Sequence, residues 1–298
     1  MAQLMSMAEN NPKSRIDILS KLYWLAGKAQ IIGITGPPGC GKSTLISQLA
    51  KRYRSKSQSV GIVAVDPSSQ ITGGALLGDR IRMGDLAGDS EVFIRSMATR
   101  GHFGGIASAT EDAVRILDAS GMDYVIVETA GAGQSDVDVK ELAQTTIVVT
   151  APGLGDEIQA LKAGIMEIGD IFVVNKADHE SADRAAQEIY SMIAMSNPID
   201  GWRPRVLKTI ATTGDGITGL VEAIDQHSKH VRESKGHQKV ADSRLRSEVL
   251  DAAKRYFEDV SLLEVASSAA FKKMMKQVEG RRIDPYTAGR KLVSKRRA

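Results

Sequence analysis

The pattern most able to do chemistry is a glycine-rich octapeptide at residues 36–43. It reads Gly-Pro-Pro-Gly-Cys-Gly-Lys-Ser and matches G-x-x-x-x-G-K-S/T at every position. Its glycines let backbone N–H groups turn inward around a phosphate, and its lysine adds a positive charge. An apolar run over 31–34 precedes it and apolar-periodic residues from Leu45 follow it. The loop therefore joins a strand to a helix, whose N-terminus also favours anions, and binding of β- and γ-phosphates is expected.

Each part of this loop has an expected role. Lys42 supplies a point charge to the phosphates and to catalysis, and the Ser43 hydroxyl can bind Mg²⁺. Cys40 is the one cysteine of the chain, so no intramolecular disulfide can form, and its place predicts a backbone contribution. The residues expected to contact the nucleotide are Gly36, Pro38, Gly39, Cys40, Gly41, Lys42, Ser43 and Thr44.

A second motif, Asn175-Lys176-Ala177-Asp178, follows the apolar run 171–174 and can recognise a base. The Asp178 carboxylate can accept hydrogen bonds from guanine N1–H and N2–H₂, a donor pair that adenine lacks, while the Lys176 stem covers the ring. By itself the motif fits a helix N-cap at Asp178 equally well. Because it follows a phosphate-binding loop, guanine recognition is favoured, and with it GTP over ATP.

A weaker signal for the base site is the small-residue loop that begins at Ala211 and Thr212. GTPases often place such a loop after the strand that follows the N-K-x-D motif. We expect a backbone amide of this loop to contact guanine O6.

The end of another apolar strand predicts a residue that senses the γ-phosphate. Glu128 closes the strand 124–127 and leads into Thr129-Ala130-Gly131, which parallels the D-x-x-G of many GTPases with a carboxylate one methylene longer. Glu128 is expected to hold Mg²⁺ through water, and the Gly131 amide to contact the γ-phosphate. Ala132 stands where other GTPases carry a water-orienting glutamine, so slow intrinsic hydrolysis is expected.

Loop charges complete the expected catalytic set. Asp66 ends the strand 61–65 and can reach Mg²⁺ or its waters, and Asp79 lies in a long glycine-rich loop that could close over the γ-phosphate. Arg82, or Arg80, could supply positive charge to the transition state. The alternative for each is a solvated side chain. The predicted metal ligands are Ser43, Asp66, Asp79 and Glu128.

The composition is that of a folded chain of 298 residues, 42% hydrophobic and 25% charged. The net charge of +3 is too small to argue for nucleic acid. No stretch approaches the ~18 apolar residues of a membrane span, and no signal peptide is recognisable. We therefore expect a cytoplasmic protein with neither a nucleic-acid nor a membrane partner.

Strands and helices alternate from residue 31 to about 210, which predicts an α/β fold with a mostly parallel sheet flanked by helices and with ligands at the carboxyl ends of the strands. The expected organisation is an N-terminal helical extension over 1–30, a nucleotide-binding domain over 31–230 and a C-terminal helical arm over 231–298. The predicted strands are 31–35, 60–65, 91–95, 123–128, 144–150, 170–175 and 205–210. The predicted helices are 14–28, 42–54, 105–119, 155–168, 180–195 and 216–228.

The C-terminal arm shows apolar residues at three- and four-residue spacing from Leu245 to Leu263, which predicts a long amphipathic helix. A second helical stretch runs from Phe271 to Val278. The arm has little neighbouring chain to cover its apolar face. It is expected to bury that face on the main domain or on another subunit.

Together these motifs resemble those of the MeaB/ArgK-type P-loop GTPases, over residues 12 to 293. The matching motifs are G-x-T-G-P-P-G-x-G-K-S-T, V-D-P-S-S, G-G-x-x-L-G-D-R-x-R-M, E-T-x-G-x-G-Q-S, N-K-A-D and R-I-D-P-Y-T-A. The resemblance implies a GTP-driven chaperone that gates loading of adenosylcobalamin into an acyl-CoA mutase, such as methylmalonyl-CoA mutase, and protects that enzyme.

The resemblance also implies roles for individual residues. Arg82 would belong to a first switch region, residues 131–138 to a second, and Lys162 to a third mobile segment that contacts the mutase and aids hydrolysis. The arm would form a homodimer. The chain departs from many relatives at Ile94-Arg95-Ser96-Met97-Ala98, where they read I-R-P-x-P, so the client could be a methylmalonyl-, isobutyryl-, 2-hydroxyisobutyryl- or ethylmalonyl-CoA mutase.

Two rival functions are open to the same residues. A nickel-inserting GTPase would carry a tract rich in His or Cys, whereas this chain has one Cys and five His. An ATP-dependent kinase linked to amino-acid transport would need to bind adenine, which the Asn175–Asp178 motif disfavours.

Overall fold

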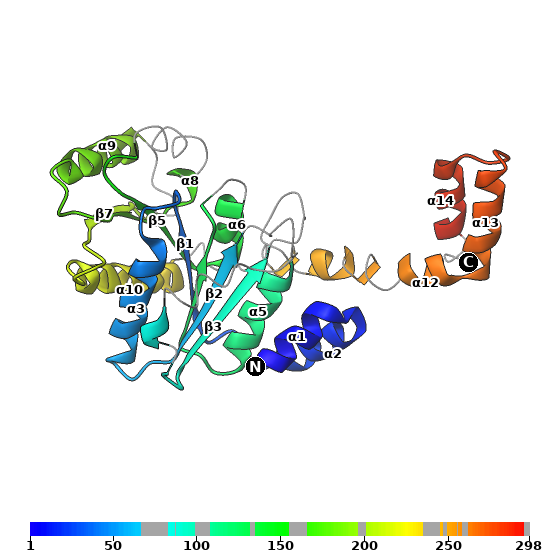
Figure 1. The fold of residues 1–298 in the computed structure, drawn as a ribbon, viewed down its shortest axis with the longest axis horizontal. Helices are drawn as coiled ribbons and strands as arrows, with labels where there is room; N and C mark the ends of the chain where they lie inside the picture. The colour runs from blue at the N-terminus through cyan, green and yellow to red at the C-terminus, as the bar shows by residue number, and fades with distance from the viewer. Residues whose placement is uncertain are drawn as a thin grey trace. The chain divides into compact units, whose positions relative to one another are not determined.

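The computed structural model describes residues 1–66, 83–86, 88–98, 108–131, 135–154, 166–195, 201–234, 245–246, 249–254, 256–257 and 262–294. The chain divides into two compact units. One comprises Met1–Asn10 and Arg15–Lys235 and contains the sheet, and the other comprises Asn11–Ser14 and Gly236–Ala298 (Figure 1).

Seven parallel strands form one sheet in the order β3-β2-β4-β1-β5-β6-β7. The predicted mostly parallel sheet is thereby confirmed. Its central strands are continuous apolar runs because helices cover both faces. The strands are β1 (Gln30–Thr35), β2 (Val60–Asp66), β3 (Val92–Ala98), β4 (Tyr124–Glu128), β5 (Thr145–Thr150), β6 (Ile171–Val174) and β7 (Arg205–Lys208).

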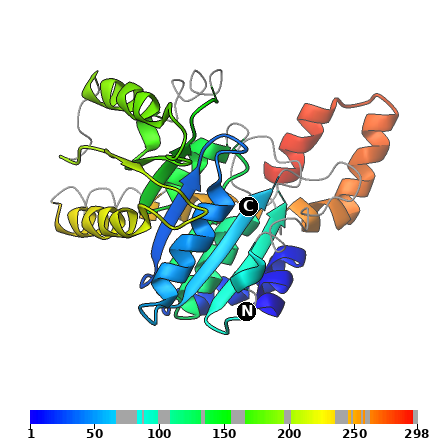
Figure 2. The same ribbon diagram turned by 60° about the vertical axis from the view of Figure 1, so that its left-hand side comes forward.

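Helices lie on both sides of the sheet (Figures 1 and 2). They are α3 (Lys42–Arg54), α5 (Ser108–Ala119), α6 (Ser135–Leu142), α8 (Met166–Ile168), α9 (Ala182–Met195) and α10 (Ile217–Glu233), with a 3-10 turn η1 (Gly84–Leu86). α3 has the bounds that the sequence predicted. Of the predicted helix over 155–168, residues 155–165 lie outside the described part of the chain.

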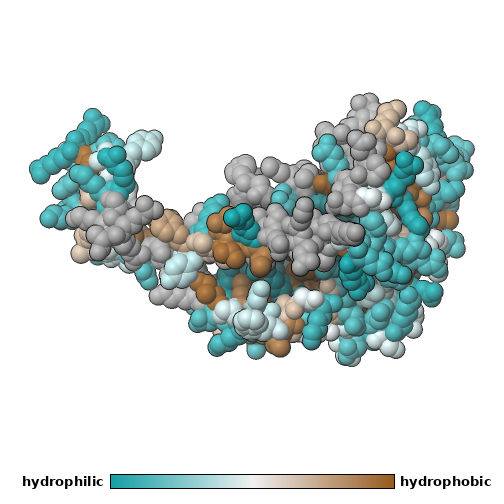
Figure 3. All heavy atoms as spheres, turned by 180° about the vertical axis from the view of Figure 1, so that it is seen from behind, coloured by the Kyte–Doolittle hydropathy of each residue, from teal (hydrophilic) through white to brown (hydrophobic). Residues whose placement is uncertain are grey.

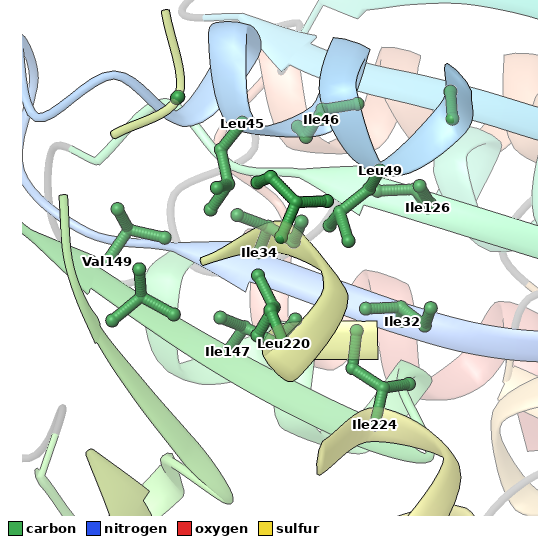
Figure 4. Close-up of a cluster of buried hydrophobic side chains, with 14 of the residues drawn as sticks. Ile32, Ile34, Leu45, Ile46, Leu49, Ile126, Ile147, Val149, Leu220 and Ile224 are labelled. Atoms are coloured by element: carbon green, nitrogen blue, oxygen red, sulfur yellow. The ribbon is translucent and has the colours of Figure 1, made fainter. Parts of the chain in front are cut away.

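Alternate residues of each strand point to opposite faces, so two apolar cores sandwich the sheet. On one face Ile32 and Ile34 of β1 meet α3 and α10 (Figure 4). On the other, Val125 and Val127 of β4 pack with α5. Burial of each such side chain contributes ~1.5–3 kcal/mol, so the strand ends that carry the predicted site are held firmly. The helix residues that fill the first core include Leu45, Ile46, Leu49, Leu220 and Ile224.

The N-terminal extension differs from the single helix predicted over 14–28. It forms two helices, α1 (Ala2–Asn10) and α2 (Pro12–Leu22). The break precedes Pro12 because a residue before proline disfavours the helical conformation, while proline suits a first helical position. α2 ends before the chain reaches Asp118, whose carboxylate accepts hydrogen bonds from the backbone N–H groups of residues 27–29. Continuing the helix would withdraw those donors.

A polar cluster lies at the amino ends of β5 and β6, at the edge of the sheet opposite the predicted site. Asp170, directly before β6, accepts hydrogen bonds from Lys140 Nζ at 2.6 Å and from the Thr146 amide at 2.7 Å. His227 of α10 lies between Asp170 Oδ1, at 3.6 Å from Nε2, and Thr145 Oγ1, at 2.9 Å from Nδ1. The cluster ties α6 and α10 to the sheet.

Acid is expected to destabilise the fold through His227. Burial lowers the pKa of this imidazole from its ordinary value of 6.5, and Asp170 opposes only part of that effect. Because the unfolded chain takes up the proton first, stability is present above about pH 6.5 and is lost as the pH falls through the lower folded-state pKa. Between roughly pH 7.5 and pH 5.5, the thermal unfolding midpoint should fall further in the wild type than in His227→Gln. An equal fall in both proteins would contradict this.

The second unit is helical in its described residues. Residues 245–246, 249–254 and 256 are helical, in line with the predicted amphipathic helix, and three helices follow: α12 (Leu262–Ser267), α13 (Ala269–Glu279) and α14 (Pro285–Ser294). Ser268 ends the run of α12 and caps α13, accepting a hydrogen bond from the Phe271 amide at 3.1 Å. No residue of α13 is fully buried, and its apolar side chains Phe271, Met274 and Val278 are half-buried.

The visible surface is mainly hydrophilic on the face drawn in Figure 3, and hydrophobic residues form small groups there. In the part of the chain that the structure describes, no helix is both long enough and apolar enough to cross a bilayer. Large exposed hydrophobic side chains include Trp24 at the N-terminus and Leu250 and Tyr286 in the second unit.

Candidate functional site

The phosphate-binding loop joins β1 to α3 in a conformation that glycine alone adopts without strain. Gly36, Gly39 and Gly41 have φ angles of 138°, 79° and 94°. A Cβ at Gly36 would overlap the Val149 carbonyl of β5, and one at Gly41 would overlap the Asn175 side chain. Gly36 and Gly41 are therefore required both by backbone conformation and by close neighbours, and Gly39 by its backbone conformation alone.

The side chain of Lys42, at the end of the phosphate-binding loop, folds back toward the start of that loop. Its Nζ donates hydrogen bonds to the carbonyl oxygens of Gly36 at 2.7 Å and Pro37 at 3.2 Å, and the residue is 7% exposed. Lys42 is also the first residue of α3, and its N-cap, Gly41, offers no side-chain hydrogen bond to the first helical turn. An ammonium group and the positive end of a helix dipole thus converge on one loop, which suits a polyphosphate.

Asn175 connects the phosphate loop to the base motif. Its side chain is buried and donates to the Cys40 carbonyl at 2.9 Å, while its Oδ1 accepts from Thr209 Oγ1 at 3.1 Å and from the Ala211 amide at 3.0 Å. The Asn175 side chain thereby links its own loop to the phosphate loop and to the loop that follows β7. Cys40 contributes its backbone as predicted, and burial raises the pKa of its thiol to about 11, so the sulfur stays protonated.

The rest of the base motif points outward. Lys176 and Asp178 are both exposed, and Lys176 adopts a left-handed φ of 54°. The N-cap alternative for Asp178 is wrong, because α9 begins only at Ala182 and the Asp178 carboxylate makes no hydrogen bond to another described residue. The carboxylate is available for a ligand.

The Ala211 amide donates to Asn175 Oδ1 at 3.0 Å, and the expected contact of a backbone amide of this loop with guanine O6 stays a prediction. Its neighbour Thr212 is exposed on the same loop. Contact of this loop with a base would therefore involve Thr212 or a shared Ala211 N–H.

Two predicted metal ligands meet at the other end of the loop. Ser43 Oγ donates to Glu128 Oε1 at 2.7 Å, and Glu128 is 7% exposed. Asp66 is the last residue of β2, and β2 pairs with β4. Ala64 of β2 lies opposite Glu128, so Asp66 lies two positions further along β2. Hydroxyl and carboxylate oxygens are the ligands that Mg²⁺ prefers, so the donor set fits this ion.

Gly131 lies directly against the phosphate-binding loop. It adopts a φ of 79°, and a Cβ there would overlap the Gly36 carbonyl and come within 2.8 Å of Lys42 Nζ. The segment that follows Glu128 therefore touches the group expected to bind phosphate.

Replacing Gly131 by alanine should disrupt this contact. The added methyl must displace the Gly36 carbonyl or the Lys42 ammonium, so the affinity for GTP is expected to fall about tenfold or more, as titration would measure. Gly121→Ala is a matched control, because Gly121 has a similar φ of 88° but nothing within 4 Å of its Cβ position. Equal losses in the two variants would attribute the effect to backbone strain alone.

Three predicted residues, Asp79, Arg82 and Lys162, lie outside the described part of the chain. Pro38, Gly39 and Thr44 are exposed beside the loop. Sequence reasoning missed the threonines that support the site. Thr129 Oγ1 donates to Thr35 Oγ1 at 2.9 Å, and Thr209 holds Asn175. Their signal is weak, since each is simply a threonine at or directly after the end of a strand.

Comparison with known proteins identifies relatives across the chain. A family model described as methylmalonyl Co-A mutase-associated GTPase MeaB matches residues 1–263. A Pyrococcus horikoshii protein described as a GTPase candidate is 45% identical over 299 residues, covering 99% of this chain and 93% of that protein. The methylmalonic aciduria type A homolog of Mus musculus, described as mitochondrial, is 35% identical over 193 residues, covering 63% of this chain and 46% of its own.

A solved structure supports the same relationship. The crystal structure of a LAO/AO transport system kinase has a TM-score of 0.69 and 25% sequence identity, covering 100% of this chain and 92% of that chain. The matched family model extends from the N-terminal helices through the whole sheet. The chain therefore belongs to the MeaB family of methylmalonyl-CoA mutase-associated GTPases.

Proposed function

We propose that this GTPase binds Mg²⁺·GTP at the site described above and uses hydrolysis to gate the loading of adenosylcobalamin into an acyl-CoA mutase. The observation that carries the nucleotide part is the Asn175 side chain, which holds the phosphate loop beside the base motif. Phosphate and base contacts are thus available within one continuous site. The mutase part is supported by the family description, which names methylmalonyl-CoA mutase.

Different residues of the site would bind the phosphates, the guanine base and Mg²⁺. Lys42 and the amides of the first α3 turn would hold the β- and γ-phosphates, and Asp178 would accept the guanine N–H donors. Ser43, Glu128, Asp66 and Asp79 would hold Mg²⁺, which when bound neutralises charge on the phosphates. Gly131 would contact the γ-phosphate through its amide.

Positive charge for the transition state would come from outside the described residues, from Arg82 or Lys162. No glutamine follows Gly131 directly, because residue 132 is alanine. Water would therefore be poorly oriented in the isolated protein. Slow intrinsic hydrolysis that a partner accelerates is the expected behaviour.

The helical arm would join two copies of the chain. Large apolar side chains, among them Val249, Leu250 and Tyr256, are exposed along the helical residues that precede α12. A second arm offers the same apolar chemistry, and isologous contacts of this kind are the commonest in dimers. The homodimer is thus part of the proposal.

The proposal is tested by mixing the purified chain with methylmalonyl-CoA mutase in the presence of GDP or a non-hydrolysable GTP analogue. A complex whose stability depends on the nucleotide, together with several-fold faster GTP hydrolysis, is expected. Lys42→Ala is the control that should lose both effects. Failure to form a complex in either state, with an unchanged rate, would refute the mutase as partner, and isobutyryl- or ethylmalonyl-CoA mutase could then be tested in the same way.

The rival functions have less support. Among the described residues no group of three or more His, Cys, Asp or Glu side chains is arranged to hold a metal ion, so nickel storage finds no site there. The word kinase belongs to the name of a structural relative. ATP that competed with GTP at equal concentration would favour that function, whereas guanine selectivity would exclude it.

A further inference from the structure

The helix α6 follows, within a few residues of the sequence, the segment that lies against the phosphate loop. It begins at Ser135, shortly after Gly131, where an added Cβ would overlap the Gly36 carbonyl and come within 2.8 Å of Lys42 Nζ. Because so few residues join the two, the position of α6 along the sheet limits where Gly131 can lie. What fixes α6 therefore also fixes Gly131.

Apolar contacts seat α6 on the sheet, and Val139 is part of the core on that face. Val139 lies over Gly33 of β1, where a Cβ would come within 2.6 Å of Val139 Cγ2 and 3.0 Å of the Ala143 methyl. Apolar contact of this kind favours closeness but carries little directional preference.

A directional contact is supplied by the ion pair between Lys140 of α6 and Asp170. Lys140 Nζ lies 2.6 Å from Asp170 Oδ1, and the two side chains are 36% and 12% exposed. Partial shelter strengthens such a charge-assisted hydrogen bond compared with one fully in water.

Asp170 is anchored firmly enough to position its partner. Its Oδ2 accepts from the Thr146 amide at 2.7 Å, its own amide donates to the Thr146 carbonyl at 2.9 Å, and its carbonyl accepts from Trp202 Nε1 at 2.9 Å. Thr146 belongs to β5, which pairs with β1, the strand that leads into the phosphate loop. Asp170 is thus held to the sheet, and the ion pair with Lys140 links α6 to Asp170.

We propose that Lys140 is a positioning residue for GTP hydrolysis: its ion pair with Asp170 holds α6 where Gly131 meets Lys42, and this sets the preference for GTP over GDP. The inference rests on the assignment of this site to GTP, and it holds whatever the partner enzyme. In P-loop enzymes the lysine contacts the β- and γ-phosphates. Displacing the residue packed on its ammonium group therefore affects the triphosphate more than the diphosphate.

The test compares Lys140→Met, which keeps the apolar stem without the charge, with the conservative Lys140→Arg. Affinities for GDP and for a non-hydrolysable GTP analogue are measured with the full chain alone, together with single-turnover hydrolysis. Lys140→Met should weaken the analogue and slow hydrolysis about fivefold or more while GDP binding changes less than about twofold. Lys140→Arg should behave as the wild type.

Lys51→Met is the matched control, because it removes a lysine that lies 2.8 Å from Asp85 in a more exposed ion pair on α3. It should change none of the three quantities. Equal loss of GDP and analogue affinity in Lys140→Met would show a merely structural role and overturn the inference, as would no loss at all. Wild-type protein that bound no guanine nucleotide would instead refute the site assignment itself, and the inference with it.

Discussion

Asp178→Asn should convert the protein from a guanine binder into a xanthine binder. The carboxylate accepts from guanine N1–H and N2–H₂, whereas an amide would face N2–H₂ with its own NH₂ donors and leave them unpaired. Xanthine carries a carbonyl at that position, which the new amide can meet as a donor. We expect GTP affinity to fall about 100-fold, which corresponds to about 3 kcal/mol, and xanthosine triphosphate affinity to rise.

The structure makes this substitution a clean test. Asp178 is exposed and makes no hydrogen bond to the described residues around it, so the substitution should leave the stability of the fold unchanged. Asp183→Asn is the control, because Asp183 is an exposed carboxylate in the first turn of α9 that pairs with Lys208 at 2.6 Å. Unchanged GTP affinity in Asp178→Asn would mean that another group reads the base.

Several features of this fold could be predicted because they depend on local patterns. All seven strands lie within a few residues of their predicted positions, and the central ones read as continuous apolar runs because parallel strands covered on both faces leave no alternation to misread. The glycines of the phosphate loop were likewise identifiable, because their φ angles exclude other residues. The meeting of Ser43 and Glu128 followed from the adjacency of β1 and β4 at their carboxyl ends.

Other features depended on partners distant in the sequence and could not be predicted. The N-terminal helix ends early because Asp118 captures the amides of residues 27–29, a contact that no local pattern encodes. The pairing of Lys140 with Asp170 is similar, since either residue alone is typical of a solvated helix end or turn. Asn175 was predicted from its motif, but its contacts with Cys40, Thr209 and Ala211 appear only in three dimensions.

The largest loss of function is expected for Lys42→Ala. The ammonium donates to the carbonyl oxygens of Gly36 and Pro37, which keeps a positive charge at the centre of the loop. Exchange of these neutral acceptors for phosphate oxygens forms stronger, charge-assisted bonds. Removal of the ammonium should therefore lower GTP affinity about 1,000-fold or more, from two bonds of about 2 kcal/mol each.

The same variant should remain folded, which separates a ligand contact from a core contact. Lys42 is buried but its charged end is surrounded by loop carbonyls and not by the apolar residues of α3, such as Leu45 and Ile46, that face β1. The thermal unfolding midpoint should change by no more than about 5 °C. Lys51→Ala, an exposed lysine on the same helix, provides the comparison for affinity. GTP binding that survived in Lys42→Ala would remove the phosphate role from this loop, because no other described lysine lies within it.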